Sequence, residues 1–273
     1  AMRRAVILLV VPALLAGCAP SAAPLPDGIA VSVFQNRFDY STRVLEIKVG
    51  NGTDATITVT RAAFESTRFS EPAIWDRPQD IPAGAARDLK VQLPEPRCDD
   101  TAPVDSVTLD FVLADGTAGT ATLTPSDEQG RVDTIKAEDC LGVSVADVVA
   151  LTPPDALEWT PGAHSPAIVE VGVQPTGAEG SVTIRQAKGT VLLGLSDPDG
   201  SPLTVLPLDL VVDARTAGTS LRLAVTPNRC DPHAVEEDKR GTFFPFDVET
   251  GDGRAGTLFG AGGEGVRGAR CGV

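Results

Sequence analysis

The sequence predicts an all-β protein of two tandem β-sandwich domains, each closed by one disulfide. Three observations predict it. Short β-branched segments recur between turns, glycine and proline are frequent throughout, and one pattern of residues occurs twice. The 27 glycines and 22 prolines disfavour helices, because glycine is a poor helix former and proline interrupts the helical hydrogen bonds. We therefore expect no long helix beyond the N-terminal segment.

The strand pattern favours an immunoglobulin-like sandwich. Residues 44–49 (VLEIKV) mostly alternate between apolar and polar, as a half-buried antiparallel strand does. Six or seven such strands in each half, with turns between them, are typical of this fold. The Cys-Trp-Cys signature of true immunoglobulin domains is absent, because Trp75 and Trp159 lie outside the cysteine pairs. The expected strands are 29–35, 43–49, 55–61, 87–93, 106–113, 118–124, 167–173, 181–187, 190–195, 204–212, 220–226, 243–249 and 255–259.

The repeated pattern is clearest at two hairpin signals. Residues 115–120 read DGTAGT and residues 252–257 read DGRAGT. Each follows a proline and an Arg-Cys-Asp triplet, at 97–99 and at 229–231. An Asp-Gly pair between apolar strands predicts a tight hairpin, because these turns need positive φ angles. The two halves are therefore expected to be copies of one domain.

These signals divide the chain into five parts. The two β-sandwich domains are expected at 29–149 and 163–273. The segment 150–162 carries three prolines and is expected to be the linker. The remaining parts are a signal peptide at 1–17 and a flexible tether at 18–28.

Four cysteines follow Cys18, and an even number in an exported chain indicates disulfides. The near-equal spacing within neighbouring pairs predicts the bonds Cys98–Cys140 and Cys230–Cys271. The alternative is a set of free redox thiols, but the chain has no Cys-x-x-Cys motif to favour it.

The N-terminus has the features of an export signal. Two arginines precede an apolar run, 5–15, which is too short to span a bilayer. The run ends in Leu-Ala-Gly-Cys at 15–18, which resembles the lipobox of bacterial lipoproteins. That resemblance implies removal of residues 1–17, diacylglycerol on the Cys18 thiol, and location on the outer face of the cytoplasmic membrane. The alternative is an ordinary signal peptide with an incidental cysteine.

The charge excludes some partners. The formal net charge is −14, and loss of Arg3 and Arg4 with the signal makes it more negative. Such a chain repels nucleic acid and anionic headgroups. We expect no nucleic-acid partner, and contact with the membrane only through the lipid.

No catalytic constellation stands out. The sequence has only two histidines, His164 and His233, and it lacks a Gly-x-Ser-x-Gly motif. It also lacks a phosphate loop and a dinucleotide fingerprint. We therefore expect no enzyme, no catalytic residue and no cofactor.

A weak metal candidate lies after the third of these cysteines. Asp231, His233 and Glu236 fall close together within RCDPHAVEEDKR and could bind zinc or a hard cation. The favoured alternative is a polar loop or one helical turn that Asp231 caps, because charge runs are usually solvated. The first half has no histidine there.

Three further features are interpreted as structural. Ser196–Gly200 (SDPDG) resembles a fragment of a calcium loop but is better explained as a turn. Asn51-Gly52-Thr53 formally fits a glycosylation acceptor, yet it also suits a turn between strands. Trp75 could be a contact residue on a loop, but we expect it to plug the end of a sandwich.

The favoured function is a non-enzymatic, lipid-anchored binding or interaction module of the cell envelope, with an envelope protein or small solute as partner. The chain resembles actinobacterial lipoproteins that carry immunoglobulin-like domains, and this implies location and architecture but no ligand. The alternative is a small-solute or metal-binding lipoprotein that serves a transporter.

Overall fold

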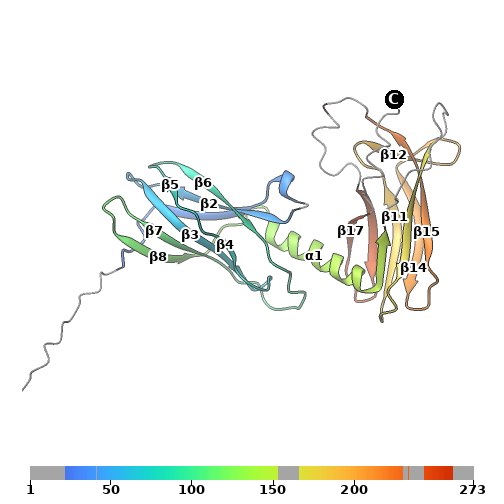
Figure 1. Ribbon diagram of the computed structural model, residues 1–273, viewed down its shortest axis with the longest axis horizontal. Helices are drawn as coiled ribbons and strands as arrows, with labels where there is room; N and C mark the ends of the chain where they lie inside the picture. Colours follow the sequence, from blue (N-terminus) through green and yellow to red (C-terminus); the bar gives the residue numbers. More distant parts are fainter. Residues whose placement is uncertain (1–21, 41, 153–165, 230–232, 234–242, 261–273) are drawn as a thin grey trace, which may run out of the picture.

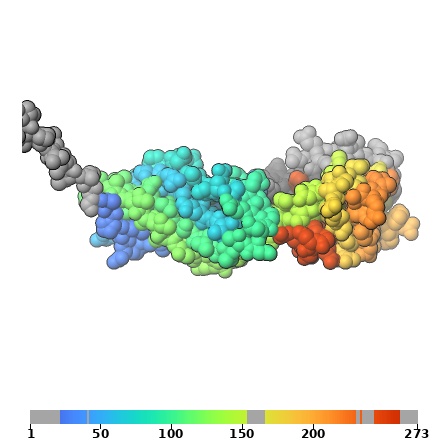
Figure 2. Space-filling model, turned by 90° about the horizontal axis from the view of Figure 1, so that it is seen from below, coloured from blue at the N-terminus to red at the C-terminus, as the bar shows by residue number. Residues whose placement is uncertain are grey.

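The chain forms two β-sandwiches joined by a helix, α1 (Arg131–Val148), as Figure 1 shows. The strands of the two sandwiches run in different directions, so the molecule is L-shaped. Seen from below, the order along the long axis is first sandwich, α1 and second sandwich (Figure 2). The computed structural model describes residues 22–40, 42–152, 166–229, 233 and 243–260.

The first sandwich packs a three-stranded sheet against a larger one. The three-stranded sheet has the order β1-β2-β6, and the other has the order β4-β3-β7-β8, with β5 also paired to β3. All these pairs are antiparallel. The strands are β1 (Ile29–Phe34), β2 (Val44–Asn51), β3 (Ile57–Ser66), β4 (Ala73–Trp75), β5 (Gln79–Ile81), β6 (Ala86–Gln92), β7 (Asp105–Val112) and β8 (Ala118–Leu123), with a 3-10 turn at Arg37–Asp39.

Alternation places the apolar side chains of these strands inside. Leu45, Ile47 and Val49 of β2 are fully buried, as the pattern of this segment predicts. Trp75 lies on β4 and is buried in the same core. It therefore fills the sandwich, as expected, and is not displayed on a loop.

The second sandwich has the same antiparallel character. One sheet has the order β13-β12-β15-β10-β9, and the other has the order β14-β11-β16-β17. The strands are β9 (Val149–Thr152), β10 (Ala167–Pro175), β11 (Ser181–Lys188), β12 (Leu193–Ser196), β13 (Pro202–Leu203), β14 (Val205–Asp213), β15 (Thr219–Pro227), β16 (Phe244–Thr250) and β17 (Ala255–Gly260).

The β7–β8 and β16–β17 hairpins each contain an equivalent cross-strand hydrogen bond. In the first, the Thr120 hydroxyl donates to Asp110 Oδ1 at 2.7 Å. In the second, the Thr257 hydroxyl donates to Asp247 Oδ1 at 2.8 Å. The two repeats seen in the sequence therefore form the same local structure.

The hairpin turns contain three residues, not the two that an Asp-Gly pair favours. The Leu113 amide donates to the Thr117 carbonyl, and the second hairpin makes the equivalent bond. Within each loop only the last glycine has positive φ, 86° at Gly116 and 89° at Gly253. This is the common three-residue loop that ends in a left-handed residue, so the glycine is required but the aspartate is not left-handed.

A β-bulge also recurs beside each hairpin. The extra residue is Thr60 on β3, opposite β7, and Arg185 on β11, opposite β16. Each bulge faces the aspartate that receives the threonine hydrogen bond, Asp110 or Asp247. The shared bulge, turn and hydrogen bond support duplication of one ancestral sandwich.

Helix α1 contradicts the expectation that the chain has no long helix after its N-terminus. It begins after Gly130, whose φ is 59°. The Asp127 carboxylate accepts hydrogen bonds from the amides of Arg131 and Val132, both at 2.8 Å, and so satisfies two of the free donors at the helix start. The helix contains no proline and one glycine, Gly142. Glycine and proline are frequent in the whole chain but nearly absent from this segment.

The helix escaped detection because its apolar residues form two stripes. Val132 and Ile135 lie on one side, whereas Leu141, Val145 and Val148 lie on another. At about 100° per residue, the mean directions of the two stripes are roughly 140° apart. Their contributions largely cancel, so the 3.6-residue periodicity of a single buried face is absent.

The second sandwich starts directly at the end of the helix. Val149 begins β9 immediately after Val148, and β9 pairs with β10 in the way that β1 pairs with β2. The linker expected at 150–162 therefore begins inside a strand of the second sandwich. The rest of that segment, from residue 153, lies outside the described residues.

Candidate functional site: the junction between the two domains

Helix α1 contributes side chains to both hydrophobic cores. Val132 and Ile135 belong to the core of the first sandwich. Leu141, Val145 and Val148 belong to the core of the second. All five are at most 6% exposed. The helix is therefore a structural part of both domains, and its surroundings are the junction.

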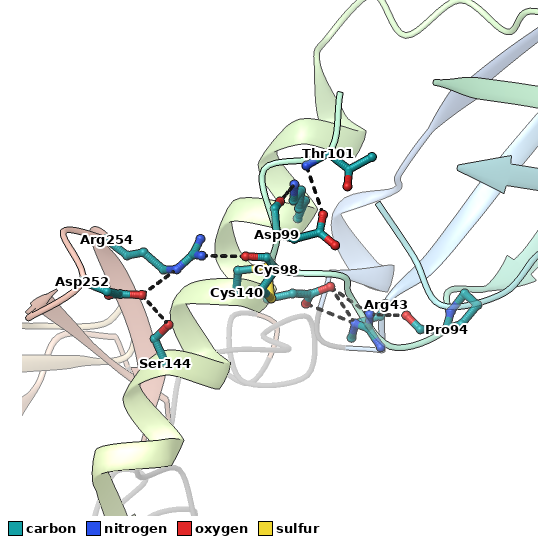
Figure 3. The surroundings of a disulfide bond; sticks show 11 residues. Arg43, Pro94, Cys98, Asp99, Thr101, Cys140, Ser144, Asp252 and Arg254 are labelled. Atoms are coloured by element: carbon teal, nitrogen blue, oxygen red, sulfur yellow. Dashed lines mark hydrogen bonds and ion pairs between the residues drawn. A yellow bond between two sulfur atoms is a disulfide. The ribbon is translucent and has the colours of Figure 1, made fainter. Parts of the chain in front are cut away.

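A disulfide joins the first sandwich to the middle of α1. Cys98 is half-buried on the segment between β6 and β7, and Cys140 is fully buried on the helix, with their Cα atoms 5.4 Å apart (Figure 3). The predicted bond Cys98–Cys140 is thus confirmed, although its second cysteine lies on a helix. Closing a loop of 42 residues stabilises the fold by about 4 kcal/mol in the chain-entropy model.

Arg43 connects α1 to two segments of the first sandwich. Its Nε lies 3.1 Å from both carboxylate oxygens of Asp139, and its Nη2 lies 2.8 Å from Oδ2. The same guanidinium donates to the Leu93 carbonyl at 3.3 Å. It also donates to the Pro94 carbonyl at 2.6 Å (Figure 3). Burial raises the pKa of the Asp139 carboxyl, and the hydrogen bonds from Arg43 oppose that shift.

Arg68 makes a second ionic connection to the start of the helix. Its Nη1 contacts both oxygens of Asp105 at 2.6 and 2.7 Å, while Nε and Nη2 contact Asp133 Oδ1 at 2.9 and 2.6 Å. The arginine side chain is only 7% exposed. Burial lowers the pKa of Arg68, but the hydrogen bonds to Asp133 and Asp105 outweigh it, so the net shift is upward.

Arg131 attaches the connection between β1 and β2. Its Nε donates to Gln35 Oε1 at 2.8 Å, and its Nη2 donates to Glu138 Oε2 at 3.0 Å. Its guanidinium carbon also lies 4.3 Å from the centre of the Tyr40 ring, a cation–π contact. Three arginines therefore fix the first sandwich on α1.

A buried carboxyl group lies beneath the same connection. Glu46 is fully buried, and Asn36 donates to it through its side chain at 2.5 Å and its backbone amide at 3.2 Å. Lys90 Nζ lies 3.7 Å from Glu46 and 2.8 Å from Asp39. Burial raises the pKa of Glu46, whereas the hydrogen bond with Lys90 lowers the pKa of Asp39. Donors from the chain already satisfy these carboxylates, so the cluster connects the β1–β2 connection to β2 and β6.

Within the described ranges, a hydrogen bond joins the two sandwiches directly. Arg254, from the turn between β16 and β17, donates through Nη2 to the Cys98 carbonyl at 2.9 Å. Its Nε contacts Asp252 at 3.1 Å, and Asp252 accepts from the Ser144 hydroxyl of α1 at 3.2 Å (Figure 3). The disulfide, the helix and the second domain therefore meet at one point. This arrangement can hold the domains in a fixed relation.

The other site residues predicted from the sequence do not belong to this junction. His233 is described and exposed. In the parts of the chain that the structure describes, no group of three or more His, Cys, Asp or Glu residues could hold a metal ion. The metal candidate and the second disulfide therefore stay predictions. Six of the residues considered in the sequence lie outside the described ranges: Cys18, Cys230, Cys271, Asp231, Glu236 and His164.

Two features interpreted as turns are turns. Asp197 Oδ1 accepts hydrogen bonds from the amides of Asp199 and Ser201, both at 2.9 Å, so it organises the SDPDG loop itself. Asn51 is 2% exposed, and its side-chain amide donates to two backbone carbonyls. It is therefore a buried turn residue, not an exposed acceptor of a sugar.

Sequence reasoning missed the junction arginines. Arg43, Arg68 and Arg131 each pair with a group far away along the chain. The available signal was the segment that became α1, which carries the acids 133, 138 and 139 and lacks proline. Recognising a helix there would have placed these acids on its surface, but their partners depend on the fold.

No helix in the ranges that the structure describes is long and apolar enough to cross a membrane.

No protein-family model and no curated protein matches the chain. Solved structures show only distant similarity. The B domain of a biofilm associated protein has 6% identity and a TM-score of 0.25, with 83% of this chain and 82% of that chain covered. The YadV chaperone has 12% identity and a TM-score of 0.20, with 80% and 92% covered.

Red sea bream transglutaminase has 12% identity and a TM-score of 0.23, with 83% of this chain covered. The match spans 29% of the transglutaminase. All three are too distant to carry an argument about function, and the fold assignment rests on the sheets themselves. The described chain is a pair of β-sandwiches joined by a shared helix.

Proposed function

We propose that this chain is a non-enzymatic, lipid-anchored interaction module of the bacterial cell envelope, which holds its second sandwich away from the membrane. The observation that carries the proposal is the place where the chain enters the first sandwich. Ala23 is 8% exposed, and its amide donates to the Ala118 carbonyl at 2.8 Å. Ala23, five positions after Cys18, is thus fixed on the fold.

That entry point lies at the end of the first sandwich opposite α1. Ala118 begins β8 directly after the β7–β8 turn. The other end of β7 is at Asp105. Arg68 binds both Asp105 and Asp133 of α1, so this end lies beside the helix. The eight residues of β7 span about 26 Å, so the entry point and the helix are separated by the length of the sheet. We name the end formed by Ala23 and residues 113–117 the anchor pole.

The second sandwich lies beyond α1, at the other end of the molecule (Figure 1). The helix is about 27 Å long, with its first turns in the core of the first sandwich and its last turns in the core of the second. With a lipid on Cys18, the anchor pole would face the membrane and the second sandwich would face outward. The disulfide Cys98–Cys140 suits an oxidising compartment, and this favours an exported protein.

The anchor is tested by Cys18→Ser in the native host. We expect the unchanged protein in the membrane fraction and the Cys18→Ser variant in the soluble fraction or the medium, whereas Ser21→Ala behaves like the unchanged protein. Membrane retention of the Cys18→Ser variant would refute the anchor.

The orientation is tested in vesicles that carry the lipidated protein. A fluorophore is attached through a non-natural residue at Asp115 or, as the matched position, at Asp199. Both aspartates are exposed and lie beside a glycine in a turn, at the anchor pole and in the second sandwich respectively. A quencher on the lipid headgroups should dim the probe at 115 and spare the probe at 199. Equal quenching would refute an outward second sandwich.

The absence of catalysis is also part of the proposal. A broad screen of ester and glycoside substrates with the purified protein should show no turnover. Turnover that disappears in a single-residue variant would replace this proposal with an enzymatic one.

A further inference from the structure

We propose that the disulfide Cys98–Cys140 is a reversible lock on the contact between the first sandwich and α1. Reduction by a dithiol would let the first sandwich move relative to the helix, while the helix stays attached to the second sandwich. This inference is independent of the lipid anchor, because it concerns only contacts within the fold.

Helix α1 is attached unequally to the two sandwiches. Toward the second sandwich it buries Leu141, Val145 and Val148 and continues into β9 without a loop. Toward the first sandwich it buries two apolar side chains, Val132 and Ile135. The apolar contact is therefore larger on the side of the second domain, and that contact does not depend on the disulfide.

The remaining contacts between α1 and the first sandwich are of another kind. They are mostly polar: the side chain of Asp133, the partner of Arg68, is 72% exposed, whereas the side chains of Arg43 and Asp139 are 26% and 15% exposed. Exposed ion pairs contribute little, because water and salt compete for both partners. The disulfide is the covalent contact on this side, and the one that a reductant breaks.

The two cysteines differ in how easily a reductant reaches them. Cys98 is half-buried and Cys140 is fully buried, so an attacking thiolate reaches the Cys98 sulfur more readily. The attack forms a mixed disulfide on Cys98 and releases Cys140 as a thiolate, which takes a proton. The second thiol of the reductant then displaces Cys98. The protein gains two electrons and two protons, and the dithiol becomes a cyclic disulfide.

The segment that carries Cys98 also contacts the second sandwich, so the exchange affects the second domain. The Cys98 carbonyl accepts the hydrogen bond from Arg254, and Lys136 of α1 donates to the neighbouring Asp99 carbonyl at 2.8 Å. Once Cys98 is free, its segment leaves the helix surface and the Arg254 contact is lost. The angle between the sandwiches then becomes variable.

The experiment uses the mature chain with Cys230→Ser and Cys271→Ser, so that dithiothreitol acts only on Cys98–Cys140. Hydrogen exchange and small-angle scattering are measured before and after reduction. We expect exchange in residues 93–104 and 250–254 to rise at least about tenfold, exchange in 141–152 to stay unchanged, and the scattering curve to indicate a wider range of shapes.

Unchanged scattering and exchange after complete reduction would overturn the proposal. A rise that includes residues 141–152 would also overturn it, because the helix would then leave both domains. If the serine pair prevents folding, the unreduced variant Cys98→Ser with Cys140→Ser, in which the other cysteines are intact, is compared with the unchanged protein by the same two measurements. Arg254→Lys is the matched control, since it keeps the cysteines and a donor beside the carbonyl.

Discussion

The two ends of α1 are attached in different ways. At its C-terminal end, the helix is part of the second core through Leu141, Val145 and Val148. Over its first half, it is held by Val132 and Ile135, by arginine–carboxylate pairs and, at its middle, by a disulfide. The first kind of contact depends on apolar area removed from water, whereas the second depends on charge, geometry and redox state. The helix is therefore better regarded as part of the second domain, on which the first domain is fixed.

The apolar end should give the largest loss when it is broken. Val145→Asp places an unpaired carboxylate in the second core, where Val145 is 2% exposed, and should lower the free energy of unfolding by about 4 kcal/mol or more. Ala146→Asp, at the exposed neighbouring position, should change it by less than about 0.5 kcal/mol. Urea unfolding followed by circular dichroism measures both. Similar losses in the two variants would contradict the burial of this end.

The covalent connection should come next. Cys98→Ser combined with Cys140→Ser removes the closure of a 42-residue loop and should cost about 3 to 4 kcal/mol. The loss should appear in the unfolding of the first sandwich, because residues 105–123 lie inside that loop. Calorimetry of the variant resolves the domain that unfolds first. Earlier unfolding of the second sandwich would contradict this comparison.

A single ionic contact should matter less. Arg68→Met removes a guanidinium that is 7% exposed and bonded to two carboxylates, so we expect a loss of about 2 kcal/mol. Asp133→Asn removes only the partner that is 72% exposed and should cost less than about 1 kcal/mol. Urea unfolding at low and high salt measures the two variants. Equal losses would mean that the exposed Asp133 accounts for the whole effect, and would contradict this ranking.

The smallest effect is expected at Glu46, and it depends on pH. Burial raises the pKa of Glu46 above its ordinary value of 4.5, so the folded protein takes up this proton before the unfolded chain does. The carboxyl therefore lowers stability at neutral pH, and this cost fades as pH falls from neutral toward 4.5. Glu46→Gln should be more stable than the unchanged protein at pH 7, with the difference shrinking on acidification. Thermal unfolding across this range tests it, and a difference that grows toward low pH would contradict it.

The β part of the fold could be predicted because its signals are local. Alternation identifies strands such as β2, and the DGxAGT repeat identifies both hairpins. The same repeat could not reveal the three-residue length of the turn. Either loop length accepts an Asp-Gly pair, and the choice depends on the flanking strands.

The junction could not be predicted, because its signals are divided between distant segments. The two stripes of α1 each face a different domain, so the helix lacks the single apolar face by which helices are recognised. The pairing of Arg68 with Asp133 depends on how the first sandwich ends beside the helix. The cysteine pair alone was visible, since it needs only an even count and a regular spacing.

The position of the disulfide also determines how the molecule would carry a mechanical load between its two ends. Tension applied along the chain from the first sandwich to the second would pass through Cys98 and Cys140 and bypass residues 99–139 between them. Strands β7 and β8 lie in that bypassed segment and would bear no pull along their backbone. From Cys140 the force would continue along the rest of α1 directly into β9, with no slack loop to extend first.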